Sequence, residues 1–159
     1  MWVNSDVARF IVVSASSASS LGEASDLSTM NRIFDMQQQQ VFSFNSITFE
    51  QGLAHDGCAF IFFKRVTECA KGSACNFIDF VVIPAGADIG KHKHALDNEE
   101  TYIILEGRGM MCLEEKEFEV EPGHVIVNRP GGTHGLRNIS DTDLKLVVFE
   151  VLVHPNRQD

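Results

Sequence analysis

The sequence predicts an all-β fold, a sandwich or small barrel that follows an N-terminal extension. Between residues 41 and 153, short runs of β-branched and aromatic residues follow one another at close spacing, and Gly, Pro, Asp or Asn bounds each run. The length of 159 residues corresponds to one domain of ordinary size, and 44% of the residues are hydrophobic. Such a chain can bury a core and enclose a pocket.

Two segments of different character are expected along the chain. Residues 1–35 contain a Ser/Ala block and little periodicity, so we expect an N-terminal extension that is partly disordered or helical. Residues 36–159 form the expected β-barrel domain. Its strand-like runs are 41–49, 58–66, 77–83, 101–105, 110–113, 118–120, 125–127 and 144–153, and the charged residues 114–117 are typical of a solvated hairpin tip.

The last run, 144–153, is apolar at both parities apart from Lys145 and Glu150. A strand of this kind is covered on both faces, either by a second sheet or by a partner subunit. Because an unpaired sheet edge is also an aggregation hazard, we expect a homodimer.

The net charge and the cysteine pattern indicate which binding partners and which cellular compartment to expect. Thirteen Lys and Arg against 22 Asp and Glu give a net charge of −9, so we expect neither nucleic acid nor a membrane as a partner. Cysteines 58, 69, 75 and 112 form no CxxC pair, which favours free thiols in a reducing compartment and leaves a Cys69–Cys75 bridge open. The apolar run at 10–13 is shorter than the roughly 7–15 residues of a secretory signal, so we expect a cytoplasmic protein.

Three histidines and one carboxylate lie in strand-like contexts: His92, His94, Glu100 and His134. Because side chains alternate along a strand, the first two can point to one face while the neighbouring lysines point to water. Imidazole nitrogens and a carboxylate oxygen are ligands of divalent transition metals. Spacing alone leaves the alternative open that these histidines are hydrogen-bonded core residues.

Two longer motifs carry a resemblance to a known family. Residues 86–107, from Gly86 through His92-Lys-His94 to Gly107, resemble the first cupin motif, and residues 123–138, from Gly123 through His134 to Asn138, resemble the second. Fifteen residues separate the two motifs.

The match has two departures from the family pattern. Five residues separate His94 from Glu100, one more than is usual, whereas Glu99 keeps the usual gap. Counting back from Gly107 favours Glu100 as the ligand, because a loop absorbs an insertion more easily than a strand. Arg129 stands where the family usually has proline, which should affect the turn and not the metal.

The resemblance covers residues 40–153 and implies a double-stranded β-helix, the jelly-roll-like cupin barrel. It also implies a divalent transition metal, Fe, Mn, Ni or Zn, held by His92, His94, Glu100 and His134. Such a site leaves one or two coordination positions open for water, substrate or dioxygen, and open sites are catalytic in type.

The resemblance therefore suggests a metal-dependent enzyme acting on a small oxygen-bearing metabolite, as an isomerase or epimerase, a lyase or cyclase, or a dioxygenase. We expect Glu100 and Tyr102 to be the catalytic residues, the tyrosine because its strand parity points it inward beside the carboxylate. A second hypothesis is a non-catalytic cupin that binds or senses a sugar or other small ligand. Turnover distinguishes the two.

Overall fold

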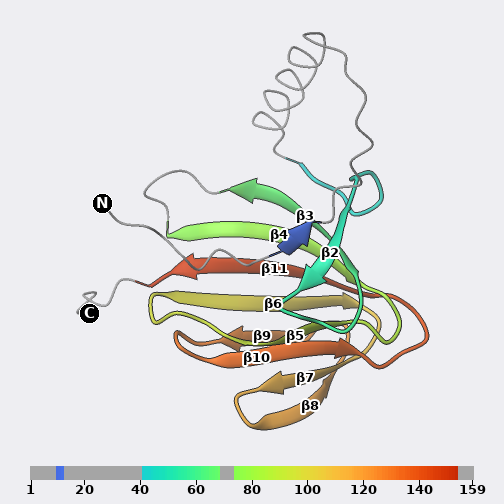
Figure 1. Cartoon of the computed structure of the whole chain (residues 1–159). Coiled ribbons are helices and arrows are strands. Elements are labelled where there is room, and N and C mark those ends of the chain that lie inside the picture. Colours follow the sequence, from blue (N-terminus) through green and yellow to red (C-terminus); the bar gives the residue numbers. More distant parts are fainter. Residues whose placement is uncertain (1–9, 13–40, 69–73, 154–159) are drawn as a thin grey trace. The chain divides into compact units, whose positions relative to one another are not determined.

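The computed structural model describes residues 10–12, 41–68 and 74–153, and every regular element in these ranges is a β-strand (Figure 1). Contacts divide the chain into two compact units, residues 1–12 with 48–159, and residues 13–47. All described strands belong to the first unit. Of the expected N-terminal extension, only Phe10–Val12 lies in the described ranges, where it forms a strand.

The strand bounds follow the chain in order. They are β1 (Phe10–Val12), β2 (Glu50–Ala54), β3 (Ile61–Glu68), β4 (Cys75–Ile83), β5 (Asp88–Lys93), β6 (Asn98–Glu106), β7 (Gly109–Leu113), β8 (Lys116–Val120), β9 (Val125–Asn128), β10 (Thr133–Asn138) and β11 (Leu144–Leu152).

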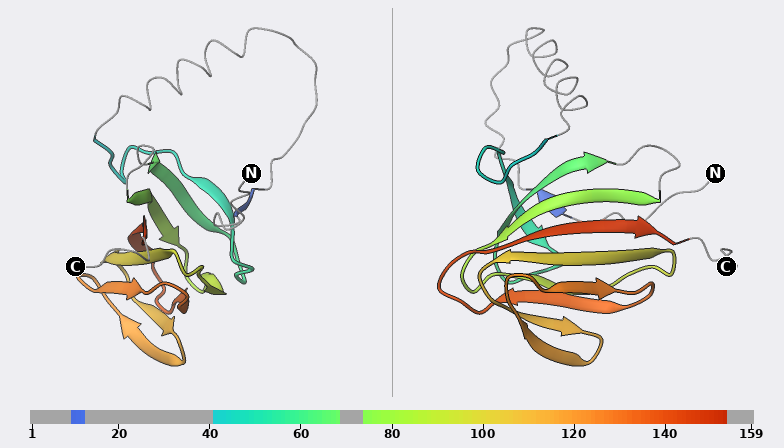
Figure 2. Two further views of the ribbon diagram at one scale, coloured as in Figure 1. Left: turned by 90° about the vertical axis from the view of Figure 1, so that its left-hand side faces the viewer. Right: turned by 180° about the vertical axis from the view of Figure 1, so that it is seen from behind.

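The strands form one sheet in the order β8-β7-β10-β5-β2-β3-β4-β11-β6-β9, with β1 paired to β2 beside this path. The described pairs are antiparallel apart from the short parallel contact of β2 with β5. Figure 2 shows that the sheet curls, so that the half with β7, β8 and β10 lies across an interior from the half with β3 and β4. This is the predicted all-β, barrel-like fold.

The interior changes from apolar to polar along the strands. One inward row across β4, β11 and β6 consists of Val81, Leu146 and Ile104, which are all buried. Four residues further along β11, the buried Glu150 lies opposite the buried Glu100 of β6. Buried carboxylates need charged or hydrogen-bonding partners, so this end of the interior is where a functional site is expected.

The expected strand at 41–49 is wrong. Residues 41–47 belong to the second unit and contain a turn, in which the backbone N–H of Ile47 donates to the Ser43 carbonyl over 3.1 Å. The serine hydroxyl also accepts from the backbone N–H of Asn45, a local bond that competes with strand pairing. The strand forms later, at Glu50–Ala54, and the strand expected from residue 58 begins at Ile61.

The cysteines depart from the expectation of free thiols. Cys58 and Cys112 are free, but Cys75 is disulfide-bonded. Residue 69, the other position considered for a bridge, lies outside the described residues. The described residues also include no helix that is long and apolar enough to cross a membrane.

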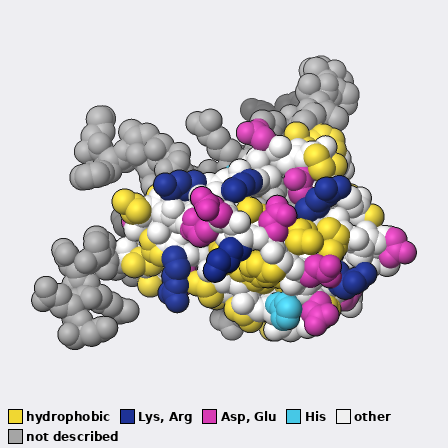
Figure 3. Space-filling view, turned by 90° about the horizontal axis from the view of Figure 1, so that it is seen from below, with side chains coloured by type: hydrophobic (Ala, Val, Ile, Leu, Met, Phe, Trp, Pro, Cys, Tyr) yellow, Lys and Arg dark blue, Asp and Glu magenta, His cyan; other side chains and the backbone are white. Residues whose placement is uncertain are grey.

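Side chains of opposite charge share the surface. Figure 3 shows Lys and Arg side chains interspersed with Asp and Glu on the face seen from below. On the β7–β8 hairpin, for example, Arg108 and Glu119 lie 3.9 Å apart. This face therefore carries no basic patch of the kind that binds a phosphate backbone.

Candidate metal centre

Four side chains from three strands and one loop meet at the polar end of the interior. His92 lies in β5 and His94 directly after it, Glu100 lies in β6, and His134 lies in β10. Lys91 and Lys93 of β5 are exposed, as strand alternation predicts. Residues that are far apart in sequence are thus brought together by the pairing of β5 with β10 and by the curl of the sheet.

The β5–β10 pair sets the positions of the two strand histidines. His134 is directly opposite His92 in this antiparallel pair, and a register shift follows between His134 and Leu136. Such a bulge bends the strand locally and re-aims its side chains. The loop that carries His94 is tied down by its backbone N–H, which donates to the Gly132 carbonyl over 2.9 Å.

The three imidazoles converge on one point through their Nε2 atoms. Nε2 of His134 lies 3.0 Å from that of His92 and 3.1 Å from that of His94, and the last two are 3.1 Å apart. Oε2 of Glu100 lies 3.1 Å from Nε2 of His134 and 3.5 Å from Nε2 of His94. All four ligand atoms are within 4.8 Å of one another.

These separations fit a metal ion. Nitrogens bound at about 2.1 Å are about 3.0 Å apart when the bond angle at the metal is 90°, and about 3.4 Å apart at the tetrahedral angle. The observed 3.0–3.1 Å lies at the short end of this range, so the three nitrogens could bind one ion together. The buried Oε2 of Glu100 has no hydrogen-bond partner, so the oxygen is also available to a cation.

The protonation states of His92 and Glu100 are those that metal ligands need. Nδ1 of His92 lies 2.9 Å from the Gly90 carbonyl, and since a carbonyl only accepts, Nδ1 carries the proton and Nε2 presents a lone pair. Burial, with contributions from His55 and His134, lowers the pKa of His92 to about 3. Burial by itself raises the pKa of Glu100, but contacts with His134 and His94 hold that pKa below its usual range. The cluster therefore combines a neutral imidazole with an ionised carboxylate at neutral pH.

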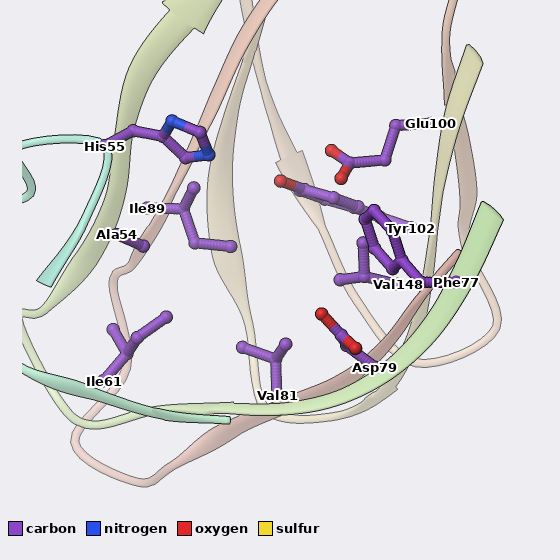
Figure 4. Close-up of a pocket in the computed structure, with 10 residues that line it drawn as sticks. All are labelled: Ala54, His55, Ile61, Phe77, Asp79, Val81, Ile89, Glu100, Tyr102 and Val148. Carbon is purple, nitrogen blue, oxygen red and sulfur yellow. The ribbon is translucent and has the colours of Figure 1, made fainter. Parts of the chain in front are cut away.

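A small cavity adjoins the cluster. Its volume is ≈ 20 Å³, which is space for roughly one or two water-sized molecules. Figure 4 shows the side chains around it, with Glu100 and Tyr102 on one side and His55 on the other. Burial first, and then the neighbouring Glu100, raises the pKa of Tyr102, so its hydroxyl stays protonated. The remaining lining residues are Ala54, Ile61, Phe77, Asp79, Val81, Ile89 and Val148.

Comparison with known proteins gives a family match around this site. The family model for the cupin domain matches residues 79–150, a range that contains all four cluster residues. Residues 79–150 therefore form a cupin domain. An uncharacterised protein of Methanocaldococcus jannaschii is 41% identical over 66 residues, or 42% of this chain and 52% of that protein. An oxalate-binding protein of Thermotoga maritima is 31% identical over 71 residues, or 45% of this chain and 58% of that protein.

These alignments span only about half the length of the two curated relatives. A structural match extends further. The crystal structure of a predicted oxalate decarboxylase from Thermotoga maritima superposes with a TM-score of 0.67 at 24% identity, over 71% of this chain and 99% of that one. This likeness supports the cupin fold alone.

Both departures from the cupin motif lie at one surface contact. Glu99 points away from the cluster, and its Oε2 accepts a hydrogen bond from the Arg129 guanidinium over 2.8 Å. Arg129 is mostly exposed. Among the described residues the structure therefore brings His92, His94, Glu100 and His134 together and leaves Glu99 outside. Tyr102 is buried beside them, its ring centroid 5.0 Å from that of His134.

Two residues of the cupin site were missed by sequence reasoning. Oε2 of Glu150, in β11, lies 3.6 Å from Nδ1 of His94. The Glu150 carboxylate also accepts hydrogen bonds from Asn76 and Asn98. Its signal was a lone carboxylate at an inward position of an apolar strand. His55 stacks on His92 with ring centroids 3.4 Å apart and ring planes 4° apart. It lies outside both cupin motifs, so no pattern identified it.

Proposed function

We propose that this cupin is a metal-dependent enzyme that acts on a small oxygen-bearing metabolite. The observation that carries the proposal is the set of three imidazole Nε2 atoms 3.0–3.1 Å apart with the Glu100 carboxylate beside them. Four protein ligands would leave one or two coordination positions of a transition metal open for a substrate. The native metal is one of the divalent ions Fe, Mn, Ni or Zn.

Different residues would bind the metal and contact the substrate. His92, His94, His134 and Glu100 would hold the metal, which when bound supplies Lewis-acid or redox chemistry to an oxygen-bearing substrate. Tyr102, with a protonated hydroxyl, is placed to donate a hydrogen bond within the cavity. The lining is mostly apolar, which lowers the local dielectric and strengthens each polar contact made inside.

The cavity argues against a sugar phosphate as substrate. Its described lining contains no Lys or Arg. Arg65 contacts the lining residue Asp79, but its Nε and Nη2 donate to the two oxygens of that carboxylate over 2.9 and 3.0 Å. A phosphate needs convergent cationic donors. We therefore favour lyase or dioxygenase chemistry over isomerisation of a sugar phosphate.

Charge balance favours a small anion or another oxygen donor. A divalent metal with three neutral imidazoles and the Glu100 carboxylate would keep one net positive charge, which attracts a single carboxylate. The cavity of ≈ 20 Å³ restricts such a ligand to a few non-hydrogen atoms beyond the metal. The relative named as an oxalate-binding protein is compatible with this class.

A second function is binding of a small acid without turnover. One observation favours it, which is that a curated relative is named for binding oxalate and not for converting it. The same cluster would then serve only to anchor the ligand. Turnover is the property that separates this alternative from the enzyme.

The test is metal-dependent turnover of a small acid. The full chain, purified without a histidine tag and loaded in turn with Fe, Mn, Co, Ni or Zn, is assayed with oxalate for binding by calorimetry, for release of formate and carbon dioxide, and for oxygen uptake. We expect turnover with at least one metal, lost in His134→Ala and kept in Glu99→Gln. Stoichiometric oxalate binding with no product from oxalate or from a panel of C2 to C4 acids would support the binding function. No metal uptake would overturn both.

A further inference from the structure

His55 lies in an unusual turn that directly follows β2. His55 and Asp56 have φ angles of 49° and 58°, a left-handed conformation that non-glycine residues rarely adopt. Consecutive residues in this region are strained, and such strain persists only where the surrounding structure enforces it. The turn is closed by the Gly57 N–H, which donates to the Ala54 carbonyl over 3.0 Å.

The same turn is clamped against β5, the strand that carries His92. The Cys58 N–H donates to Oδ1 of Asp88 over 2.6 Å. A Cβ atom at Gly90 would overlap the His55 carbonyl oxygen, and one at Gly57 would overlap the Asp88 carbonyl oxygen. Only glycine at these two positions lets the two backbones approach so closely. The His55 backbone is therefore fixed relative to the metal-ligand strand.

The His55 ring is fixed as well. It lies flat on the His92 ring, with centroids 3.4 Å apart and planes 4° apart. Among the described residues, no hydrogen bond or ion pair involves the His55 ring nitrogens. A rigid ring with uncommitted nitrogens is prepared to contact a ligand.

The cavity leaves few groups that can hydrogen-bond an occupant. Four of its lining side chains are polar: His55, Asp79, Glu100 and Tyr102. Both oxygens of Asp79 accept from Arg65, and Glu100 belongs to the metal-ligand cluster. Figure 4 shows the Glu100 carboxylate and the Tyr102 hydroxyl directed into the cavity, with the His55 ring on the opposite wall. Any molecule in ≈ 20 Å³ contacts these walls.

We propose that His55 is a ligand-contacting residue of this site, which hydrogen-bonds one oxygen of a small carboxylate whose other oxygen faces the metal-ligand cluster. The inference rests on the proposed function, because it requires a metal-held ligand, and it deepens that function by naming the second contact. Two contacts on opposite walls select ligands with two oxygens on one carbon over ligands with a single oxygen.

Formate is the smallest such carboxylate and serves as the probe. The full chain is loaded with Co²⁺, and formate is titrated while the visible spectrum is followed. His55→Phe keeps an aromatic ring for stacking on His92 but has no nitrogen. His55→Asn fits the left-handed backbone and lacks the ring, so it decides the question if the phenylalanine variant does not fold. His124→Phe, at an exposed histidine outside the site, is the matched control.

We expect one equivalent of Co²⁺ in every variant and a formate dissociation constant about tenfold or more higher in both His55 variants than in the wild type and His124→Phe. A formate constant within about twofold of the wild type in a Co²⁺-loaded His55 variant would overturn the inference alone. So would a Co²⁺-loaded wild type whose spectrum formate leaves unchanged. A wild type that takes up no metal would overturn the proposed function and this inference together.

Discussion

Arg129 and Glu99 form an ion pair at the protein surface, with Nη1 and Oε2 2.8 Å apart. These are the two positions at which the sequence departs from the cupin motifs. Because alternate side chains of β6 point to opposite faces, a Glu99 engaged at the surface places Glu100 inside. Glu99 thus has a partner at the surface, and Glu100 keeps the inward position of the ligand strand.

Single glutamine substitutions test this register. Glu100→Gln removes the only carboxylate of the metal-ligand cluster, so we expect loss of metal, measured by elemental analysis after dialysis. Glu99→Gln breaks an exposed ion pair worth about 0–1 kcal/mol and should retain the metal. The opposite pattern, in which Glu99→Gln loses metal and Glu100→Gln keeps it, would show that the ligand is Glu99.

The histidines themselves are tested by a double substitution. His92 and His134 are directly opposite in the β5–β10 pair, so His92→Ala combined with His134→Ala removes two of three nitrogen ligands. We expect no bound metal and loss of the stabilisation by metal, which is about 2.7 kcal/mol when the free metal is at 100 times its dissociation constant. His124→Ala, at the exposed β8–β9 turn, is the control. Equal metal content in the double variant and the control would contradict a metal centre at these histidines.

Substitution of Glu150 tests whether its carboxylate positions the metal ligand His94. Its carboxylate lies 3.6 Å from Nδ1 of His94 and is fixed by Asn76 and Asn98. Carboxylates that accept a hydrogen bond from a ligand histidine orient its ring, and their loss typically lowers metal affinity about 10- to 100-fold. Metal binding by His94 would need only a small movement to form this bond. We expect a decrease of that size in Glu150→Gln, measured by competition with a chelator. Glu119→Gln, at an exposed site, should leave the affinity unchanged. An unaltered affinity in Glu150→Gln would exclude this positioning role.

Part of this site was predictable from sequence because it depends on local spacing. His92 and His94 lie two residues apart in one motif, and the place of His134 beside them was implied by the resemblance of the second motif to the cupin pattern. His55 and Glu150 were not predictable, because each meets the cluster only through tertiary pairing, of β2 with β5 and of β11 with β6. The strand at Glu50–Ala54 was missed because its sequence, Glu-Gln-Gly-Leu-Ala, has no β-branched residue, and its position depends on its neighbours in the sheet.

A homodimer remains a prediction. Its support from a strand at 41–49 is gone, but the outward residues Val147, Phe149 and Val151 of β11 are only half-buried. Apolar side chains in this state on a central strand favour cover by a second copy. Light scattering at micromolar concentration should give twice the chain mass. A monomer mass would contradict the prediction, and substitution of Phe149 by Lys should shift a dimer towards monomer.

Anomalous diffraction from crystals of the Co²⁺-loaded protein tests the metal centre most directly. We predict one strong peak at about 2.1 Å from Nε2 of His92, His94 and His134 and from Oε2 of Glu100, with at least one further ligand that is not from the protein and lies on the side of the cavity. A peak elsewhere, or an ion closed off by four protein ligands in a tetrahedron, would contradict an open metal centre in this cupin.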